Sequence, residues 1–184
     1  MVLTSGGVYT KSGDATRRYV GTFRTTGTTG QTEDSVTKRF VFNANNQISK
    51  NVRKVDTTGS WTYQATAYRY ANNSSLNKVE VVCGLSSFIN LTATVFFHAG
   101  ANLQGARTAI GEDSSTSPAS ECIITDGASI PNYYVGTNAY LSKMPTAGYH
   151  YYSWLESTFT TNVMTFYGAD SDYRRTGLIG YFIC

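Results

Sequence analysis

The segment 90–99, with the sequence NLTATVFFHA, is the feature that most constrains the fold. Apolar side chains recur in it at every second position. Successive side chains of a β-strand point to opposite faces of the sheet, so this period of two predicts a strand that buries one face. The buried face is expected to carry Leu91, Ala93, Val95 and Phe97.

Short segments of similar character run along most of the chain, and turn residues such as Gly, Asn, Ser and Asp separate them. No window shows the three-four spacing of an amphipathic helix. About ten to twelve short strands at intervals of roughly 8–12 residues are typical of an antiparallel β-sandwich. We therefore predict an all-β, jelly-roll-like sandwich. The other expected strands cover 19–26, 36–43, 47–55, 61–70, 78–84, 107–111, 122–125, 129–135, 148–158, 163–167 and 176–183.

Two segments, 1–16 and 138–147, carry no strand pattern. The first is rich in Gly, Ser and Thr, and we expect it to be a flexible or strand-leading N-terminal segment. The rest, 17–184, is predicted to be one sandwich domain, because a chain of this length can bury a sizeable core.

Two hairpins are predicted from turn residues. The Asn-rich segment 43–46 should let 47–55 pair back with 36–43, since Asn tolerates left-handed backbone. The dipeptide Asp126-Gly127 favours a tight turn between 122–125 and 129–135.

Among the aromatic residues of this chain, Tyr is more frequent than Phe. Tyr occurs 14 times and Phe 9 times, whereas charged residues make up 15% of the chain. Tyr combines an apolar ring with a hydroxyl that can stay in water, so it suits half-buried surfaces. Its abundance indicates sheet faces, subunit contacts or a recognition surface.

Several classes of function are excluded at this stage. The net charge is +3, and the basic residues are scattered with a modest N-terminal bias, which does not favour nucleic-acid binding. No segment is long and apolar enough to cross a bilayer, and the N-terminus lacks a signal-peptide pattern, so a soluble chain made in a cytoplasm is expected. Cys83, Cys122 and Cys184 are too far apart for a metal pair or a disulfide framework, and we expect free thiols.

Catalytic and metal-binding patterns are weak. His98 and His150 lie in strand segments without a nucleophile motif such as GxSxG. The acidic pairs Glu112-Asp113 and Asp170-Ser171-Asp172 read as solvated turn residues, and the calcium-loop pattern is absent. We therefore predict no catalytic residues, no metal and no cofactor, and hence no enzyme.

Glycan recognition uses an aromatic face for stacking and polar side chains for the hydroxyls, and the sequence offers several such groups. None of them is singled out, so the receptor-binding residues stay unknown at this stage. The groups are Tyr133-Tyr134, Tyr149-His150-Tyr151-Tyr152 and Tyr173-Arg174-Arg175.

Several blocks, in the same order and spacing, resemble a pattern that recurs in tail-fibre and other structural proteins of tailed bacteriophages. The recurring pattern carries Trp where this chain has Phe42. The blocks are RYVGTFRTT (18–26), QTEDS (31–35), KRFVFN (38–43), SWTY (60–63), YRYAN (68–72), VEVVCG (79–84), IGEDS (110–114) and GYHYYSWLE (148–156).

The resemblance implies a virion-exposed module, expected to be a homotrimer, on a tail fibre, tail tip or head fibre. Such a module would contact other virion proteins and a bacterial surface glycan or outer-membrane receptor, without nucleic acid or membrane insertion. The leading hypothesis is therefore a receptor-binding domain. The alternatives are a head fibre, decoration, collar or baseplate component that binds only other virion proteins, and, as a third, a polysaccharide depolymerase.

Overall fold

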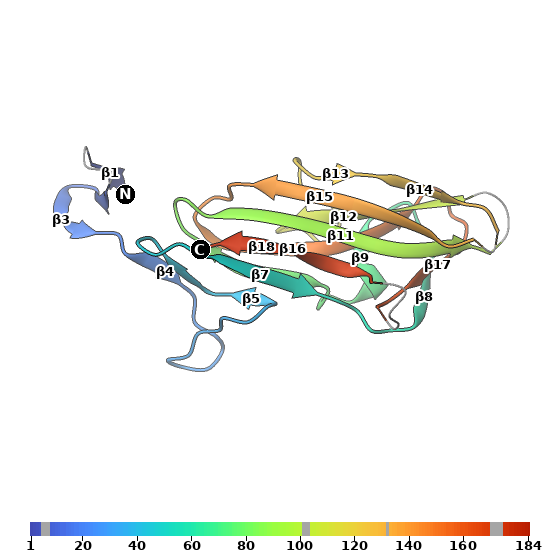
Figure 1. The fold of residues 1–184 in the computed structure, drawn as a ribbon, viewed down its shortest axis with the longest axis horizontal. Coiled ribbons are helices and arrows are strands. Elements are labelled where there is room, and N and C mark those ends of the chain that lie inside the picture. The colour runs from blue at the N-terminus through green and yellow to red at the C-terminus, as the bar shows by residue number, and fades with distance from the viewer. Residues whose placement is uncertain (5–7, 101–103, 132, 170–174) are drawn as a thin grey trace.

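Two β-sheets packed face to face form the body of the protein (Figure 1). The structure is a computed structural model that describes residues 1–4, 8–100, 104–131, 133–169 and 175–184. These residues form eighteen strands and one short 3-10 helix, η1 (Ala71–Asn73). The predicted all-β class and β-sandwich are confirmed.

The first sheet has six strands, and every pairing in it is antiparallel except that of β10 with β5. In spatial order it contains β14 (Asp126–Ser129), β12 (Gln104–Glu112), β16 (Gly148–Thr158), β10 (Lys78–Cys83) and β5 (Lys38–Arg39), with β9 (Arg69–Tyr70) also paired with β16.

The second sheet has seven strands and is antiparallel throughout. It runs in the order β13 (Ile123–Ile124), β15 (Val135–Lys143), β11 (Phe88–Ala99), β17 (Met164–Tyr167) and β8 (Ser60–Tyr63), while β18 (Gly177–Ile183) pairs with β11 and β7 (Ser49–Lys54) pairs with β18.

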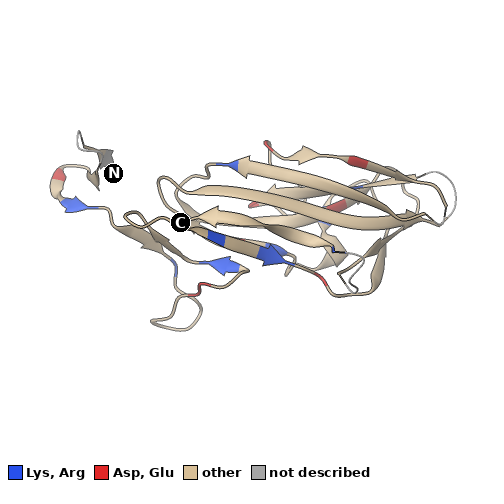
Figure 2. Cartoon of the chain, in the orientation of Figure 1, with Lys and Arg blue, Asp and Glu red and all other residues tan. Residues whose placement is uncertain are grey.

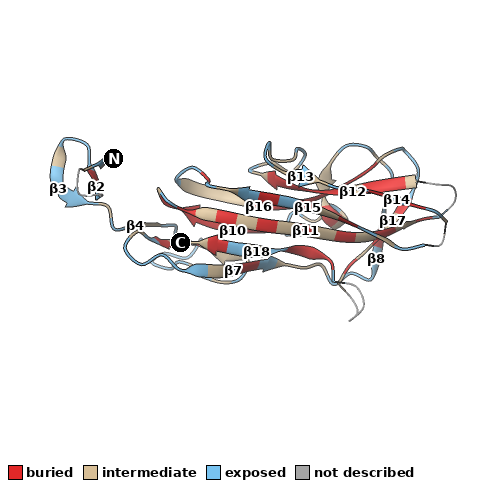
Figure 3. Ribbon diagram, turned by 45° about the horizontal axis from the view of Figure 1, so that its top comes forward, coloured by how far each residue is buried: buried red, intermediate tan, exposed pale blue. Residues whose placement is uncertain are grey.

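The core lies between the sheets and is rich in aromatic rings. Trp61 of the second sheet meets Trp154 of the first edge to face, with ring centroids 6.3 Å apart. Phe166 stacks on Trp61 and also contacts Phe97. Along β11 every second residue is buried, as the alternation in 90–99 predicts (Figure 3). The expected inward face of this strand is thus confirmed.

Two strands, β18 and β17, pair one after the other with the same edge of β11. β18 pairs with residues 88–94 of β11, and β17 pairs with residues 96–99. Thr94 is therefore opposite Gly177, and Phe96 is opposite Tyr167.

The N-terminal part of the chain lies at one end of the sandwich (Figure 1). It contains a three-stranded sheet of β1 (Val2–Leu3), β2 (Tyr9–Lys11) and β3 (Asp14–Arg18), followed by β4 (Gly21–Phe23) paired with β6 (Val41–Asn43). We call residues 1–24 the N-terminal arm.

Two expectations about strand-free segments are wrong. Residues 1–16 hold β1, β2 and most of β3, whose side chains are mainly exposed and so leave no apolar alternation. Residues 138–143 belong to β15, where the inward positions include Thr137 and Ala139. Small and polar inward residues hide the period of two.

Both predicted hairpins are also wrong. β7 pairs with β18, which is far from it in the sequence, and β6 pairs with β4. Asp126 and Gly127 belong to β14, which pairs with β12. A Cβ atom at Gly127 would lie 2.7 Å from the ring of Phe97, so this glycine allows close packing and does not make a turn.

Candidate functional site

The outer face of the seven-stranded sheet carries an ordered array of side chains. β11 contributes Thr94, Phe96 and His98 to this face, because alternate residues of a strand point the same way. Strand register then fixes their neighbours: Thr94 stands between Asn138 and Gly177, and Phe96 stands between Gly136 and Tyr167.

Four rings gather at one end of this face, and we call them the aromatic cluster: Phe96, His98, Tyr134 and Tyr167. The ring centroids of Tyr134 and Tyr167 are 5.1 Å apart, and each lies 5.6 Å from that of His98. A Cβ atom at Gly136 would be 3.0 Å from the Phe96 ring, so the ring packs over the glycine backbone. The Tyr134 side chain is 56% exposed, and the cluster therefore reaches solvent.

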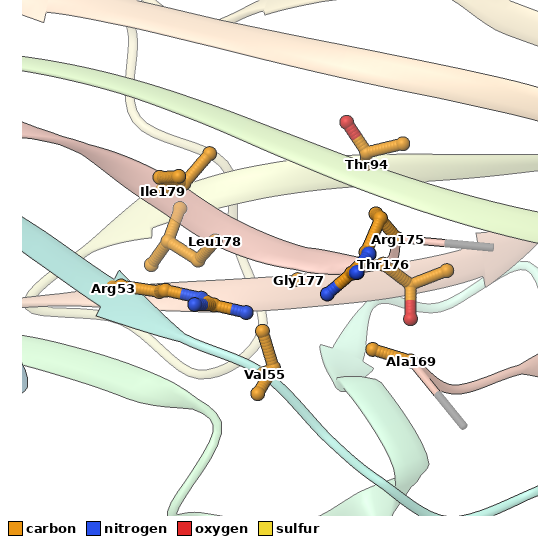
Figure 4. Close-up of a pocket in the computed structure, with 9 residues that line it drawn as sticks. All are labelled: Arg53, Val55, Thr94, Ala169, Arg175, Thr176, Gly177, Leu178 and Ile179. Carbon is orange, nitrogen blue, oxygen red and sulfur yellow. The ribbon is translucent and has the colours of Figure 1, made fainter. Parts of the chain in front are cut away.

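A cavity of about 200 Å³ lies near the place where the strand paired with β11 changes from β18 to β17. Gly177 has φ +144°, and a Cβ atom there would be 2.5 Å from the carbonyl oxygen of Lys54, so only glycine fits. Figure 4 shows the lining residues, which are Arg53, Val55, Thr94, Ala169, Arg175, Thr176, Gly177, Leu178 and Ile179.

The cavity combines apolar walls with hydrogen-bond donors. The guanidinium group of Arg53 forms no ion pair with any described residue, and Arg175 lies on the same cavity. The Thr176 side chain is only 2% exposed, and its hydroxyl has no hydrogen-bond partner in the described part of the chain. Buried hydroxyl groups are normally hydrogen-bonded, so this one marks a position where a ligand atom could accept or donate.

A second polar group lies on the other side of β15, and we call it the carboxylate cluster: Glu112, Asp113, Glu121, Lys143 and His150. Lys143 Nζ is 2.6 Å from a Glu112 oxygen and 3.2 Å from a Glu121 oxygen. His150 Nδ1 is 2.7 Å from an Asp113 oxygen. The prediction that these acids are solvated turn residues is wrong for Glu112, which belongs to β12 and pairs with Lys143, whereas Asp113 follows the strand and contacts His150.

His150, Asp113 and Thr146 have the spacing of a nucleophilic triad, since Thr146 Oγ1 is 3.1 Å from His150 Nε2. The same Nε2 lies 2.9 Å from the Thr146 carbonyl oxygen, which can only accept a hydrogen bond. The hydroxyl group and the carbonyl oxygen of Thr146 thus share one ring nitrogen of His150, and together with the Asp113 contact they hold residues 146–150 in place.

The structure separates the other aromatic candidates. Tyr134 lies in the aromatic cluster, and Tyr133 is exposed beside it. Tyr152 is fully buried on β16 and donates to Glu112, whereas Tyr149 donates to Glu80 and stacks under Arg24. Asp170, Asp172, Tyr173 and Arg174 lie outside the described residues.

Three cysteine thiols are free in the structure: Cys83 and Cys184 are buried, and Cys122 is half-buried. Burial raises the pKa of Cys83 to about 12, so this thiol stays protonated. Within the described ranges, no set of three or more His, Cys, Asp or Glu side chains is placed to bind a metal ion.

Arg53, Phe96 and Thr176 were not among the sequence-based candidates. Arg53 sits in an ordinary basic strand, and only its register opposite Ile179 brings it to the cavity.

Among the described residues, no helix is long and apolar enough to cross a membrane. Neither a protein-family model nor a curated protein matches this sequence.

Proposed function

We propose that this chain is a virion module of a tailed bacteriophage, on a tail fibre or tail tip, that binds a glycan on the bacterial surface through the outer face of the seven-stranded sheet. The sequence blocks described above support the phage assignment. One structural observation carries the glycan assignment: the aromatic cluster reaches solvent on the same sheet face as a cavity lined with hydrogen-bond donors, and Thr94 of that cavity is two residues from Phe96 on β11.

The cluster suits a sugar ring for physical reasons. The apolar face of a pyranose packs on an aromatic ring, and Tyr in addition offers a hydroxyl to the solvent side. Three of the four rings belong to paired strands, Phe96 and His98 to β11 and Tyr167 to β17, and Tyr134 directly precedes β15, so the rings are held in place before a ligand arrives. Preorganised rings lose little conformational entropy on binding.

Several copies on one particle would make weak contacts sufficient. Linked binding sites gain apparent affinity without new contacts, because the second binding event becomes intramolecular. A homotrimer, which the sequence resemblance implies, would present three such faces. The arm supports self-association, because Val20 is 65% exposed and Phe23 is 71% exposed.

The decisive experiment compares ring variants for adhesion to host cells and for binding on a glycan array. Tyr134→Ala and Tyr167→Ala should each weaken both signals at least tenfold. Tyr140→Ala is the matched control, because Tyr140 is an exposed ring on the outer face of β15 but lies outside the cluster. Equal loss in all three variants, or loss in none, would refute binding at the cluster.

One observation favours a second function, that of a head-fibre, decoration, collar or baseplate component that binds only virion proteins. The exposed apolar residues of the N-terminal arm are a surface for such a partner. The two functions separate in the same experiment: a purely structural component binds no glycan and no cell, yet incorporates into particles. The depolymerase alternative receives no support from the carboxylate cluster, whose acids are held by Lys143 and His150.

A further inference from the structure

We propose that the cavity beside the aromatic cluster binds the carboxylate group of an acidic sugar. The inference rests on the proposed glycan-binding function and deepens it by naming the ligand class. Three features carry it: an arginine that forms no ion pair with a described residue, a buried hydroxyl with no hydrogen-bond partner in the described part of the chain, and a position two residues along β11 from Phe96.

Arg53 combines a position at the cavity with the absence of an ion pair to any described residue. Arg53 lies on the outer face of β7, opposite Ile179, with its guanidinium group at the cavity (Figure 4). A guanidinium group presents a planar fork of donors that matches a carboxylate in two parallel hydrogen bonds. Four other arginines already pair with carboxylates of the chain: Arg17, Arg39, Arg69 and Arg107.

The surroundings of the cavity favour an anion over a neutral group. Figure 2 shows basic residues on β7, which borders the cavity. Arg175 also lines the cavity. Positive charge beside low-dielectric walls raises the local concentration of anions. The hydroxyl of Thr176 supplies a neutral donor that a carboxylate oxygen can use.

The cavity and the rings are close enough for one sugar residue to occupy both. Thr94 borders the cavity, and Phe96 is the next outward residue on β11. Two residues along a strand span roughly 7 Å, which is about the full length of a hexuronic acid from its carboxylate to the hydroxyl group on the opposite side of the ring. The carboxylate would lie at Arg53 while the pyranose packs against Phe96 and Tyr167.

Phosphate groups share this anionic chemistry, so the test must separate the two sources. The probes are D-glucuronate, its methyl ester, D-glucose, glucose 6-phosphate, acetate and inorganic phosphate. Each is titrated into the ¹⁵N-labelled full chain at millimolar concentrations. The readouts are the backbone amide signals of Thr94 and Gly177 and the Arg Nε–H signals, assigned by substitution.

We expect glucuronate to shift these signals and to bind at least tenfold more tightly than its methyl ester, glucose or acetate. Arg53→Gln should lower the glucuronate affinity tenfold or more, since charged hydrogen bonds contribute at least this much. Arg53→Lys should restore it only in part, because an ammonium group lacks the fork. Arg18→Gln, which alters an exposed arginine of the arm, should leave the affinity unchanged.

The contrary outcomes are distinguishable. Equal binding of glucuronate, acetate and inorganic phosphate would show an adventitious anion only and would overturn the proposal. Preference for glucose 6-phosphate would replace the carboxylate by a phosphate and overturn it as well. Binding of neutral sugars that Tyr167→Ala abolishes and Arg53→Gln leaves intact would overturn the acidic class while the glycan function stands. Cell adhesion that no ring variant changes would instead refute the proposed function.

Discussion

Trp61 Nε1 donates a 2.6 Å hydrogen bond to Glu156 Oε2, and this bond joins the two sheets of the sandwich at a fully buried carboxylate. Arg69 completes the arrangement with Nε at 2.9 Å and Nη2 at 2.8 Å from Glu156 Oε1. Trp61 belongs to β8 of one sheet, and Glu156 belongs to β16 of the other.

This carboxylate should make stability depend on pH. Burial raises the pKa of Glu156 from 4.5 to about 7, although the bonds from Trp61 and Arg69 act to lower it. Between these values the folded state holds a proton that the unfolded state has lost, so the free energy of unfolding should fall as pH rises from 4.5 to 7. The decrease should be on the order of 1–3 kcal/mol.

Urea unfolding at a series of pH values measures this effect. Glu156→Gln cannot titrate at this position, and its stability should be nearly constant across the same window. A wild-type midpoint that rises from pH 4.5 to 7 would mean that the Arg69 ion pair outweighs burial.

Asp56 should produce the opposite dependence at lower pH. Burial acts to raise the pKa of Asp56, but hydrogen bonds from Asn77, Thr58 and Asn72 outweigh it and hold the pKa below 3.8. A depressed pKa contributes stability that is present above pH 3.8 and is lost as pH falls through the folded value.

Removing one donor tests this network. Asn77→Ala should cost about 1–3 kcal/mol at neutral pH, because it deletes a buried partner of the carboxylate. Acid unfolding of this variant should also show a weaker dependence on pH. Asn45→Ala, at an exposed turn position, is the control and should change neither quantity.

Gly180 should be essential for the pairing of β18 with β11. A Cβ atom at this position would lie 1.9 Å from the carbonyl oxygen of Asn90, which is backbone and cannot move aside. Gly180→Ala should therefore lower the free energy of unfolding by about 2–4 kcal/mol, as overpacking and lost strand pairing do. Gly27→Ala has no heavy atom within 4 Å of the new Cβ and serves as the matched control in thermal unfolding. Equal melting temperatures in the two variants would contradict this account.

The sequence predicts the strands that bury one face, and it fails where burial is weak or shared. The period of two in 90–99 matches β11 because each inward residue is apolar. Part of β15 was not predicted because small or polar residues, Thr137 and Ala139, point inward. The strands of the arm were not predicted because their side chains are mainly exposed. The partner of β7 could not be predicted, since β18 follows more than a hundred residues later and local turn residues do not report long-range pairing.

The candidate site was predictable only as a class of residue. Abundant Tyr indicated a recognition or contact surface, and Tyr134 was one of several equal candidates. Only register places Tyr167 beside Phe96 and Gly177 beside Thr94. The role of Arg53 depends on the ionic partners that the fold gives to other arginines, which no linear pattern contains.

The N-terminal arm yields the prediction that decides how the protein assembles. Val20 and Phe23 are largely exposed, and burying each against a neighbouring copy would contribute about 1.5–3 kcal/mol. Light scattering across a dilution series should therefore show a stable trimer, and the double variant Val20→Ser/Phe23→Ser should dissociate at higher concentrations than the wild type. Ile123→Ser removes an exposed apolar side chain from β13, an edge strand of the second sheet outside the arm. This variant should leave the mass unchanged. A wild-type monomer at every concentration would contradict self-association through the arm.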